Sequence, residues 1–238
     1  MVTLSERMKQ YEGISKTVLM PNMPVIVRVD GRAFHTYTKK FKKPYDERLA
    51  KAMTDTTEFL CKNIPGCVMG YTQSDEISLV LTDYKTYDTT AWLSYEVQKL
   101  CSIIASMATL QFYRSIAEQI EEPTKGTPTF DARVFSIPTH EVNNYFIWRQ
   151  QDCIRNSITT HARSLYTHKE LEGRNSAVKL EMMFDAGLDW NALDTRVKYG
   201  VVWYKADNRE ERCKWRTATE TPLFNEDKQF VEDIMTRL

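Results

Sequence analysis

Two short apolar runs that carry acidic residues at one end constrain this chain more than any other feature. Val25–Asp30 is rich in β-branched residues and ends in an Asp-Gly pair, and Ile77–Leu81 follows directly on Asp75 and Glu76. If the two strands are neighbours, about 4.8 Å apart, these carboxylates converge on one spot. Converging carboxylates repel one another unless a cation lies between them, and Mg²⁺ prefers such hard oxygen ligands.

The order of the predicted elements makes the two strands neighbours. Asp46 is a good N-cap for a helix that buries Leu49, Met53, Thr57 and Leu60 and ends at Pro65-Gly66. Strands over 67–72 and 77–81, a helix over 89–119 and a strand over 130–137 follow. This is the β-α-β-β-α-β order of a ferredoxin-like core, in which the first and third strands are central neighbours.

The second half of the chain has a different pattern. Helices are predicted over 139–166 and 169–184, and Tyr199–Tyr204 is predicted to be a strand in a hairpin. The fold class is therefore α+β. We interpret residues 1–138 as the catalytic core and residues 139–238 as a helical and hairpin elaboration packed on it, so that the chain forms one compact unit.

Composition excludes several classes of protein. The 238 residues carry a formal net charge of zero, so any nucleic-acid partner would have to be bound by local basic patches, for which Lys39–Lys43 and Arg209–Arg216 are the candidates. Five cysteines without a CxxC pair argue against a disulfide framework and favour reduced thiols in the cytoplasm. The N-terminus lacks a signal peptide, and every apolar run is too short for a membrane span.

The acidic motifs suit the transfer of phosphorus-containing groups. Two Mg²⁺ ions about 3.5–4 Å apart are a common device of such enzymes. After Asp30, the small Gly31 lets the backbone approach a triphosphate, and the N–H groups of residues 32–35 would line the phosphates. We therefore hypothesise a metal-dependent nucleotidyltransferase. Taken singly, an Asp-Gly pair is a plain turn, and Ser74-Asp75 suits an ordinary hairpin tip.

Three further motifs leave alternatives open. Lys99, on the long helix, could reach a phosphate or simply face solvent. Asp131 and Arg133 share one strand face, where they could form an ion pair or contact RNA. Trp148 and Arg149 could stack on and hydrogen-bond a nucleotide, although an aromatic residue at helical spacing is usually part of the core.

Four segments together resemble a known family. VRVDGRAFHTY, YTQSDEISLVL, FDARVF and YFIWRQQDC, in this order and spacing, are similar to the histidine-tRNA guanylyltransferase family and its "-like protein" branch. The resemblance covers most of the chain, from about Lys9 to Lys205. It implies the palm domain shared with nucleic-acid polymerases and nucleotidyl cyclases. It also implies addition of nucleotides to the 5′ end of tRNA, in the 3′-to-5′ direction.

The resemblance assigns roles to individual residues. Asp30, Asp75 and the Gly31 carbonyl would bind two Mg²⁺ ions, with Glu76 in support as a catalytic residue. ATP would activate the 5′ end, and the 3′-hydroxyl of GTP or another nucleoside triphosphate would then attack it. A homotetramer is also implied. The implied nucleotide-binding residues are Gly31, Arg32, Ala33, Phe34, His35, Lys43, Asp46, Ser74 and Lys99, and the candidate RNA contacts are Arg133, Trp148, Arg149, Arg155 and Asn156.

One departure from the family pattern bears on the substrate. Enzymes dedicated to histidine tRNA carry a His-x-x-Asn-Asn-Leu-Tyr-Asn stretch where this chain has Ile154–His161, which keeps only the first asparagine, Asn156. This favours templated repair of 5′-truncated tRNA over obligatory addition of one guanosine to histidine tRNA, which is the alternative. A nucleotidyl cyclase and a non-catalytic tRNA-binding module are less favoured readings.

Overall fold

The structure is a computed structural model that describes residues 2–86, 88–120, 126–206, 214–218 and 220–236. The elements of the described residues are α1 (Leu4–Gly13), β1 (Val25–Gly31), α2 (Phe34–Tyr37), η1 (Thr38–Lys40), α3 (Glu47–Asn63), β2 (Cys67–Gln73), β3 (Glu76–Leu81), η2 (Trp92–Tyr95), α4 (Val97–Ala117), β4 (Phe130–Ser136), η3 (Thr139–Glu141), α5 (Val142–Leu165), α6 (His168–Leu171), α7 (Ser176–Asp185), η4 (Trp190–Ala192), α8 (Thr195–Tyr199), β5 (Val201–Ala206), β6 (Lys214–Thr217) and α9 (Lys228–Thr236).

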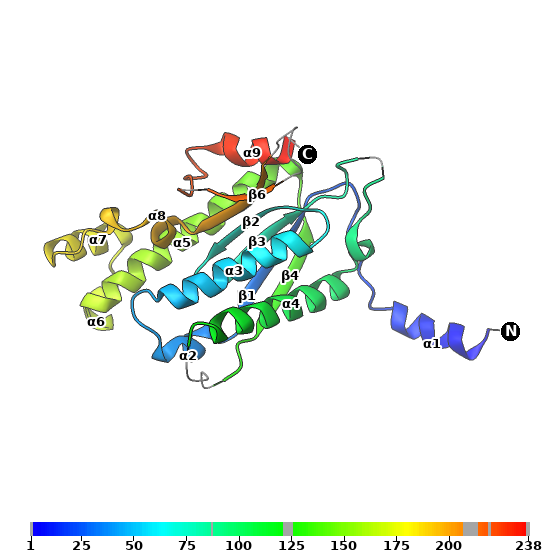
Figure 1. Ribbon diagram of the computed structural model, residues 1–238, viewed down its shortest axis with the longest axis horizontal. Coiled ribbons are helices and arrows are strands. Elements are labelled where there is room, and N and C mark those ends of the chain that lie inside the picture. The colour runs from blue at the N-terminus through cyan, green and yellow to red at the C-terminus, as the bar shows by residue number, and fades with distance from the viewer. Residues whose placement is uncertain (1, 87, 121–125, 207–213, 219, 237–238) are drawn as a thin grey trace.

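One antiparallel sheet organises the molecule (Figure 1). Its strand order is β4-β1-β3-β2-β5-β6, so β1 and β3 are direct neighbours in the centre. The predicted β-α-β-β-α-β core is confirmed, with α3 and α4 as its two helices. Strands β5 and β6 come after residue 138 and extend the same sheet. The two parts that we proposed from the sequence therefore share one sheet.

Helices α3 and α4 cover one face of the sheet. Asp46 caps α3 as predicted, since its carboxylate accepts a hydrogen bond from the Arg48 backbone N–H at 3.0 Å. Met53 and Leu60 are buried as expected from their helical spacing. On α4, Phe112 is fully buried and its ring packs against those of Phe34, Tyr37 and Phe130.

Helices α5 and α9 cover the opposite face. Tyr71 of β2 packs edge to face against Phe146 of α5 and against Phe224, and its hydroxyl donates to the Tyr199 carbonyl at 2.9 Å. Gln150 of α5 bonds to the backbone of Pro222 and Phe224. These contacts fix α5 on the sheet. Its C-terminal half extends past the sheet and forms a separate small core with α6, α7 and α8 (Figure 1).

Two predicted helices have different bounds in the structure. The helix expected from Thr89 begins only at Val97, because the preceding turn η2 contains left-handed backbone at Leu93 and Ser94. That turn is tied to the N-terminal segment, where Leu19 N–H donates to the Tyr95 carbonyl at 3.0 Å. Tertiary pairing thus overrides the helical pattern here.

The helix expected over 169–184 divides into α6 and α7. Gly173 adopts a left-handed φ of 70°, and Asn175 then caps a new helix by accepting from the Val178 N–H at 3.0 Å. The hairpin expected around Tyr204 is confirmed, with β6 as the partner of β5. The basic patch Arg209–Arg216 lies mostly outside the described residues. Among the helices described, none has the length and apolarity that crossing a membrane requires.

The Asp46 cap predicts an acid-sensitive contribution to stability. The Arg48 side chain, aided by backbone N–H donors of Lys42 and Arg48, lowers the pKa of the Asp46 carboxyl from 3.8 to about 2. A group with a lowered pKa stabilises the folded state above its unfolded pKa and loses this effect as the pH falls through its folded pKa. We expect Asp46→Ala to lower the free energy of unfolding by about 1–2 kcal/mol at pH 7, and this difference to shrink from about pH 4 to pH 2.

Urea denaturation at several pH values measures this difference. The control is Glu47→Ala, which removes an exposed carboxylate from the same helix start and should cost less than about 0.5 kcal/mol. An Asp46→Ala penalty that stays constant down to pH 2 would contradict the assignment.

Candidate active site

A two-residue hairpin loop brings the acidic strand ends together. Gln73 of β2 pairs with Glu76 of β3, and the loop between them is Ser74-Asp75, with a positive φ of 51° at Ser74. The Gly31 N–H at the end of β1 donates to the Asp75 carbonyl at 3.0 Å. The two acidic ends therefore meet, as expected from the element order.

The strand register arranges charged residues in rows. Asp30 lies opposite Glu76 on β3 and opposite Asp131 on β4, so these three acids form one row across the sheet. The adjoining row on the same face pairs Arg28 with Arg133. Anionic and cationic groups thus stand side by side on the face that α5 covers only in part.

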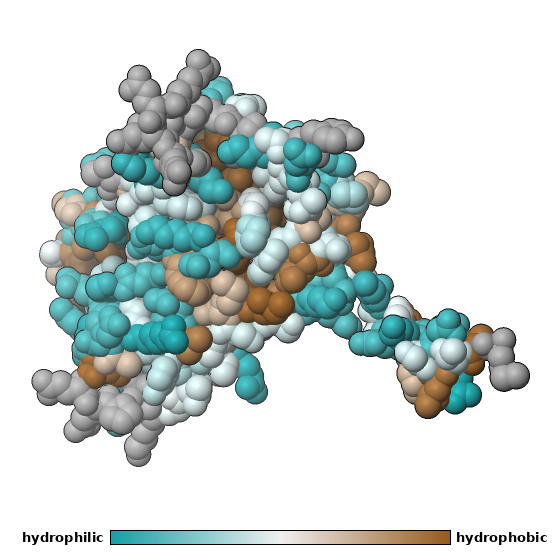
Figure 2. Space-filling view, turned by 45° about the vertical axis from the view of Figure 1, so that its right-hand side comes forward, coloured by the Kyte–Doolittle hydropathy of each residue, from teal (hydrophilic) through white to brown (hydrophobic). Residues whose placement is uncertain are grey.

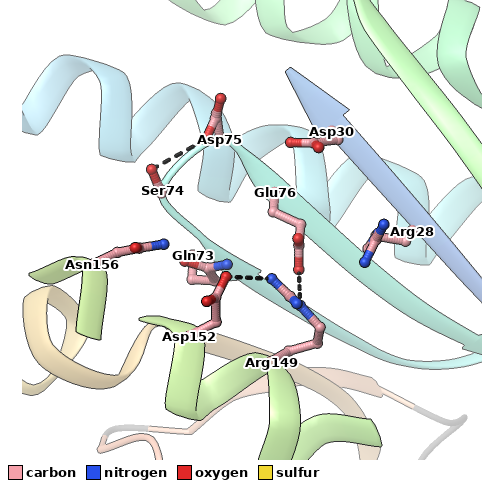
Figure 3. A pocket seen from close by; sticks show the side chains of 9 residues that line it. All are labelled: Arg28, Asp30, Gln73, Ser74, Asp75, Glu76, Arg149, Asp152 and Asn156. Carbon is pink, nitrogen blue, oxygen red and sulfur yellow. Dashed lines mark hydrogen bonds and ion pairs between the residues drawn. The ribbon is translucent and has the colours of Figure 1, made fainter. Parts of the chain in front are cut away.

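A pocket of about 280 Å³ lies between these strands and α5. Figure 3 shows Asp75 and Ser74 at the hairpin tip, Asp30 at the strand end and the α5 side chains opposite them. Every lining residue is charged or polar, which suits ions and phosphates rather than apolar ligands. The lining residues are Arg28, Asp30, Gln73, Ser74, Asp75, Glu76, Arg149, Asp152 and Asn156.

Asp30 and Asp75 are the two acids that repel each other. Burial raises the pKa of the Asp75 carboxyl, and the negative charge of Asp30 raises it further, against smaller opposing effects that include the Ser74 hydroxyl and the His35 ring. A cation between the two carboxylates would relieve this repulsion.

Glu76 has a different environment. It is buried, and its carboxylate accepts from Arg149 Nε at 2.7 Å, while another nitrogen of the same guanidinium contacts Asp152 at 2.7 Å. Burial raises the pKa of the Glu76 carboxyl, and the Arg149 hydrogen bond opposes that rise. In Figure 3 the Glu76 side chain points to Arg149 rather than towards Asp75. Arg149 therefore pairs with Glu76 and, together with Arg155, with Asp152. Among the described residues, neither Asp30 nor Asp75 forms an ion pair.

The donor set fits Mg²⁺. Among the residues that the structure describes, no three His, Cys, Asp or Glu side chains gather as a complete metal cage. Magnesium is usually bound by one or two carboxylates together with waters and substrate phosphates. Asp30, Asp75 and the adjacent Gly31 carbonyl supply such a set, and the mutual repulsion of the two acids is the charge pattern that a divalent ion would neutralise.

The segment after Gly31 forms a tight turn between β1 and α2. A Cβ atom on Gly31 would lie 2.4 Å from the Phe34 ring, so only glycine fits there. Ala33 adopts a left-handed φ of 54° and starts α2. The Phe34 ring is buried in the core and is not available to stack on a base. Arg32 and His35 are exposed beside it.

Three residues with implied nucleotide contacts lie elsewhere. Lys99 forms an ion pair with Glu96 at 2.9 Å in the first turn of α4, whereas α4 reaches the pocket end of β4 only at Thr109, about 15 Å further along the helix. The Asp46 carboxylate accepts hydrogen bonds from the backbone N–H groups of Lys42 and Arg48 and from the Arg48 guanidinium. Lys43 is exposed in the loop before α3. Within one chain, the structure does not bring these residues into the pocket.

The candidate RNA contacts surround the pocket. Trp148 is half exposed, and the guanidinium groups of Arg28 and Arg149 lie 5.7 Å and 4.3 Å from the centre of its ring. Arg133 is exposed and contacts Asp131 at 3.5 Å. Asn156 lines the pocket, and Arg155 next to it contacts Asp152 at 2.8 Å.

The sequence analysis missed Arg28, Gln73 and Asp152. A signal existed for Arg28, because a charged residue inside an apolar central strand needs a polar neighbour on its face. A signal also existed for Gln73, because it directly precedes the Ser74-Asp75 loop. A two-residue hairpin loop pairs the residue before it with the residue after it, so Gln73 lies on the same sheet face as Glu76. No sequence pattern indicated Asp152 as a site residue, since its place in the pocket depends on how α5 packs on the sheet.

Comparisons with known proteins show what the chain is similar to. A family model described as tRNAHis guanylyltransferase matches residues 5–138, more than half of the chain. The probable tRNA(His) guanylyltransferase of Dictyostelium discoideum is 31% identical over 95% of this chain and 89% of its own length.

Two solved structures of bacterial proteins extend the likeness to nearly the whole chain. A tRNA(His) guanylyltransferase-like protein in complex with ATP is 39% identical with a TM-score of 0.90, and the match covers 98% of this chain and 99% of that one. A structure of such a protein in complex with GTP is 38% identical with a TM-score of 0.81, over 97% of this chain and 98% of that one. The expected palm-like fold is confirmed by this likeness.

The buried ion pair predicts asymmetric effects on stability. We expect Arg149→Met to lower the free energy of unfolding by about 3–5 kcal/mol, because it leaves the Glu76 carboxylate buried without a partner. Replacing both members, as Glu76→Gln with Arg149→Met, should recover most of that loss. Urea denaturation measures both effects.

Arg155→Met is the matched control. Arg155 also pairs with Asp152, but its side chain is 57% exposed, so its loss should cost less than about 1 kcal/mol. Equal penalties for Arg149→Met and the double variant would show that Arg149 stabilises by packing rather than through Glu76.

Proposed function

Because the chain belongs to the tRNA(His) guanylyltransferase family of nucleotidyltransferases, we propose that it adds nucleotides to the 5′ end of 5′-truncated tRNA, in the 3′-to-5′ direction and by base pairing with a template. The meeting of two uncompensated carboxylates, Asp30 and Asp75, in one polar pocket carries the chemical part of this proposal. The bound ATP and GTP of the similar bacterial proteins support nucleotides as substrates.

Different residues of the pocket would bind the metal ions, the phosphates and the nucleotide during an in-line displacement at phosphorus. Two Mg²⁺ ions, held by Asp30, Asp75 and the Gly31 carbonyl, would supply charge neutralisation and orientation. Arg28, whose buried Nε has no hydrogen-bond partner within the described part of the chain, is placed to bind a phosphate, and exposed Arg133 lies beside it in the register. Ser74, at the hairpin tip, would contact the nucleotide.

Two successive displacements account for the expected substrates. ATP first transfers its AMP group to the 5′-monophosphate of the RNA, and pyrophosphate leaves. The 3′-hydroxyl of the incoming nucleotide then attacks the 5′-phosphorus of the RNA, and AMP leaves. Arg32 and the backbone around Ala33 and His35 would bind the triphosphate, in the αL turn before α2. Positioning and charge neutralisation dominate both steps.

The segment Ile154–His161 supports repair over obligatory guanosine addition. In this chain, Ser157 accepts a hydrogen bond from Trp190 Nε1 at 3.1 Å, and Thr159 accepts from Lys179 at 3.2 Å. These side chains hold α5 against η4 and α7. Arg155 and Asn156 are the exposed residues of this turn on the pocket side, where they and Trp148 would contact the RNA end.

The family resemblance adds an oligomeric state and a cellular location to this proposal. We expect a homotetramer that works in the cytoplasm, with Lys43 and Lys99 completing a nucleotide site that one chain leaves incomplete. Helix α1 buries none of its side chains and exposes Leu4, Met8 and Tyr11 (Figure 2), which supports an assembly that covers them. Sedimentation equilibrium of the purified protein tests the oligomeric state.

The substrate is tested with purified protein, Mg²⁺ and two RNAs. We expect 5′-labelled tRNA that lacks its first nucleotide to be extended, in the presence of ATP, only by the nucleotide complementary to the opposing base. Guanosine addition to full-length histidine tRNA without extension of the truncated tRNA would contradict repair and indicate the dedicated enzyme. A cyclic product from nucleotide alone would indicate a cyclase.

Removing either uncompensated acid should remove the chemistry. We expect Asp30→Asn and Asp75→Asn to lower the rate of extension about a hundredfold or more, since bound metal supplies several kcal/mol of transition-state stabilisation. Both should also weaken Mn²⁺ binding, measured by electron paramagnetic resonance without RNA. Asp185→Asn, an exposed acid on α7, is the control and should retain both properties. Unchanged extension in Asp30→Asn would contradict the two-metal mechanism, and tRNA binding by the wild-type protein without any extension would indicate a binding module.

A further inference from the structure

Gln73 is a buried polar side chain that the proposed chemistry does not use. It is the last residue of β2, and only 6% of its surface is exposed. Its Oε1 atom is buried and has no hydrogen-bond partner among the described residues. Burial of a carboxamide without a partner costs free energy that an apolar side chain of the same size would avoid. An unsatisfied group in a native structure therefore calls for a partner that the folded chain does not contain.

The position of Gln73 assigns this partner to the pocket. Gln73 lies opposite Glu76 in the hairpin register, on the sheet face that α5 covers. It lines the pocket together with Asn156 and the Asp30–Asp75 pair. Figure 3 shows its carboxamide inside the ring formed by Asn156, Asp152 and Arg149. A ligand held by the two acids would thus lie within reach of a neutral amide.

The chemistry of the lining restricts the ligand group. The acids and arginines of the pocket suit metal ions and phosphates, whereas Gln73 and Asn156 are its two neutral amides and suit a neutral polar group. No lining residue is aromatic or apolar, so the pocket offers no surface on which a base could stack. A sugar hydroxyl, which donates a hydrogen bond and needs no stacking surface, fits this side of the pocket.

We propose that Gln73 Oε1 accepts a hydrogen bond from a ribose hydroxyl of the substrate, and so makes the site prefer ribonucleotides over deoxyribonucleotides. This inference rests on the proposed function, because it takes a nucleotide as the ligand of the pocket. The hydroxyl belongs either to the incoming nucleoside triphosphate or to the 5′-terminal nucleotide of the RNA. Asn156, next to Gln73 in the pocket, supports the same sugar.

The test pairs one near-isosteric variant with matched ligands. Gln73→Met keeps the length of the side chain and removes the carboxamide. The control, Gln98→Met, changes an exposed glutamine on α4. Calorimetry with Mg²⁺ and without RNA compares ATP, 2′-deoxyATP and 3′-deoxyATP. Fluorescence anisotropy without nucleotide compares a truncated tRNA with the same tRNA carrying a 2′-deoxy first nucleotide.

We expect the effect of the ribose hydroxyl on binding affinity to depend on the Gln73 side chain. In at least one of the two arms, the wild-type protein and Gln98→Met should bind the ribose form about five- to tenfold more tightly than the deoxy form, the ratio expected for one hydrogen bond. Gln73→Met should bind both forms as weakly as the wild type binds the deoxy form. The arm that shows the coupling identifies the source of the hydroxyl.

A purely structural role of Gln73 gives a different result. Because Gln73 Oε1 has no hydrogen-bond partner among the described residues, Gln73→Met should leave the midpoint of thermal unfolding unchanged or raise it. Equal weakening of ribose and deoxy forms in both arms, or no preference in the wild type, would overturn the inference while leaving the proposed function intact. Failure of the wild-type protein to bind any nucleotide or tRNA would instead overturn the proposed function.

Discussion

The antiparallel register between β1 and β3 is the constraint on which the site depends. It sets Asp30 opposite Glu76 and lets the Gly31 N–H bond to the Asp75 carbonyl. Since side chains alternate between the two faces of a strand, a shift of one residue would turn Asp30 into the apolar core under α3 and α4. The fully buried valines that alternate with Arg28 and Asp30 on β1 make that shift costly.

The arrangement of charges follows from this register and from one arginine of α5. Arg149 is buried and bonds to both Glu76 and Asp152, and Arg155 adds a second cation at Asp152, so two arginines balance these two acids on the pocket wall. Asp30 and Asp75 then remain as an unbalanced pair at the hairpin tip. Unpaired carboxylates attract divalent cations, whereas acids that an arginine already neutralises attract them less.

Local patterns predicted the four core strands, the adjacency of β1 and β3 and most of α3, because alternation and helical spacing reflect burial directly. They did not predict that β5 and β6 extend the same sheet. They failed where a contact distant in sequence decides the backbone. The N-terminal segment pairs with Tyr95 and delays the start of α4 to Val97. Lys99 looked like a phosphate ligand, but only the direction of α4 in space shows that it lies at the far end of that helix from the pocket.

Residue types and spacing alone were sufficient to identify the acidic strand ends, the core topology and the family to which the motifs are similar, because each depends on local pattern or on element order. Which acids stay uncompensated depended on the packing of α5, which brings Arg149 to Glu76 from 73 positions away in the chain. The buried Oε1 atom of Gln73, which lacks a hydrogen-bond partner in the described part of the chain, likewise became visible only in three dimensions, since hydrogen-bond satisfaction is a property of the packed neighbourhood and not of the residue.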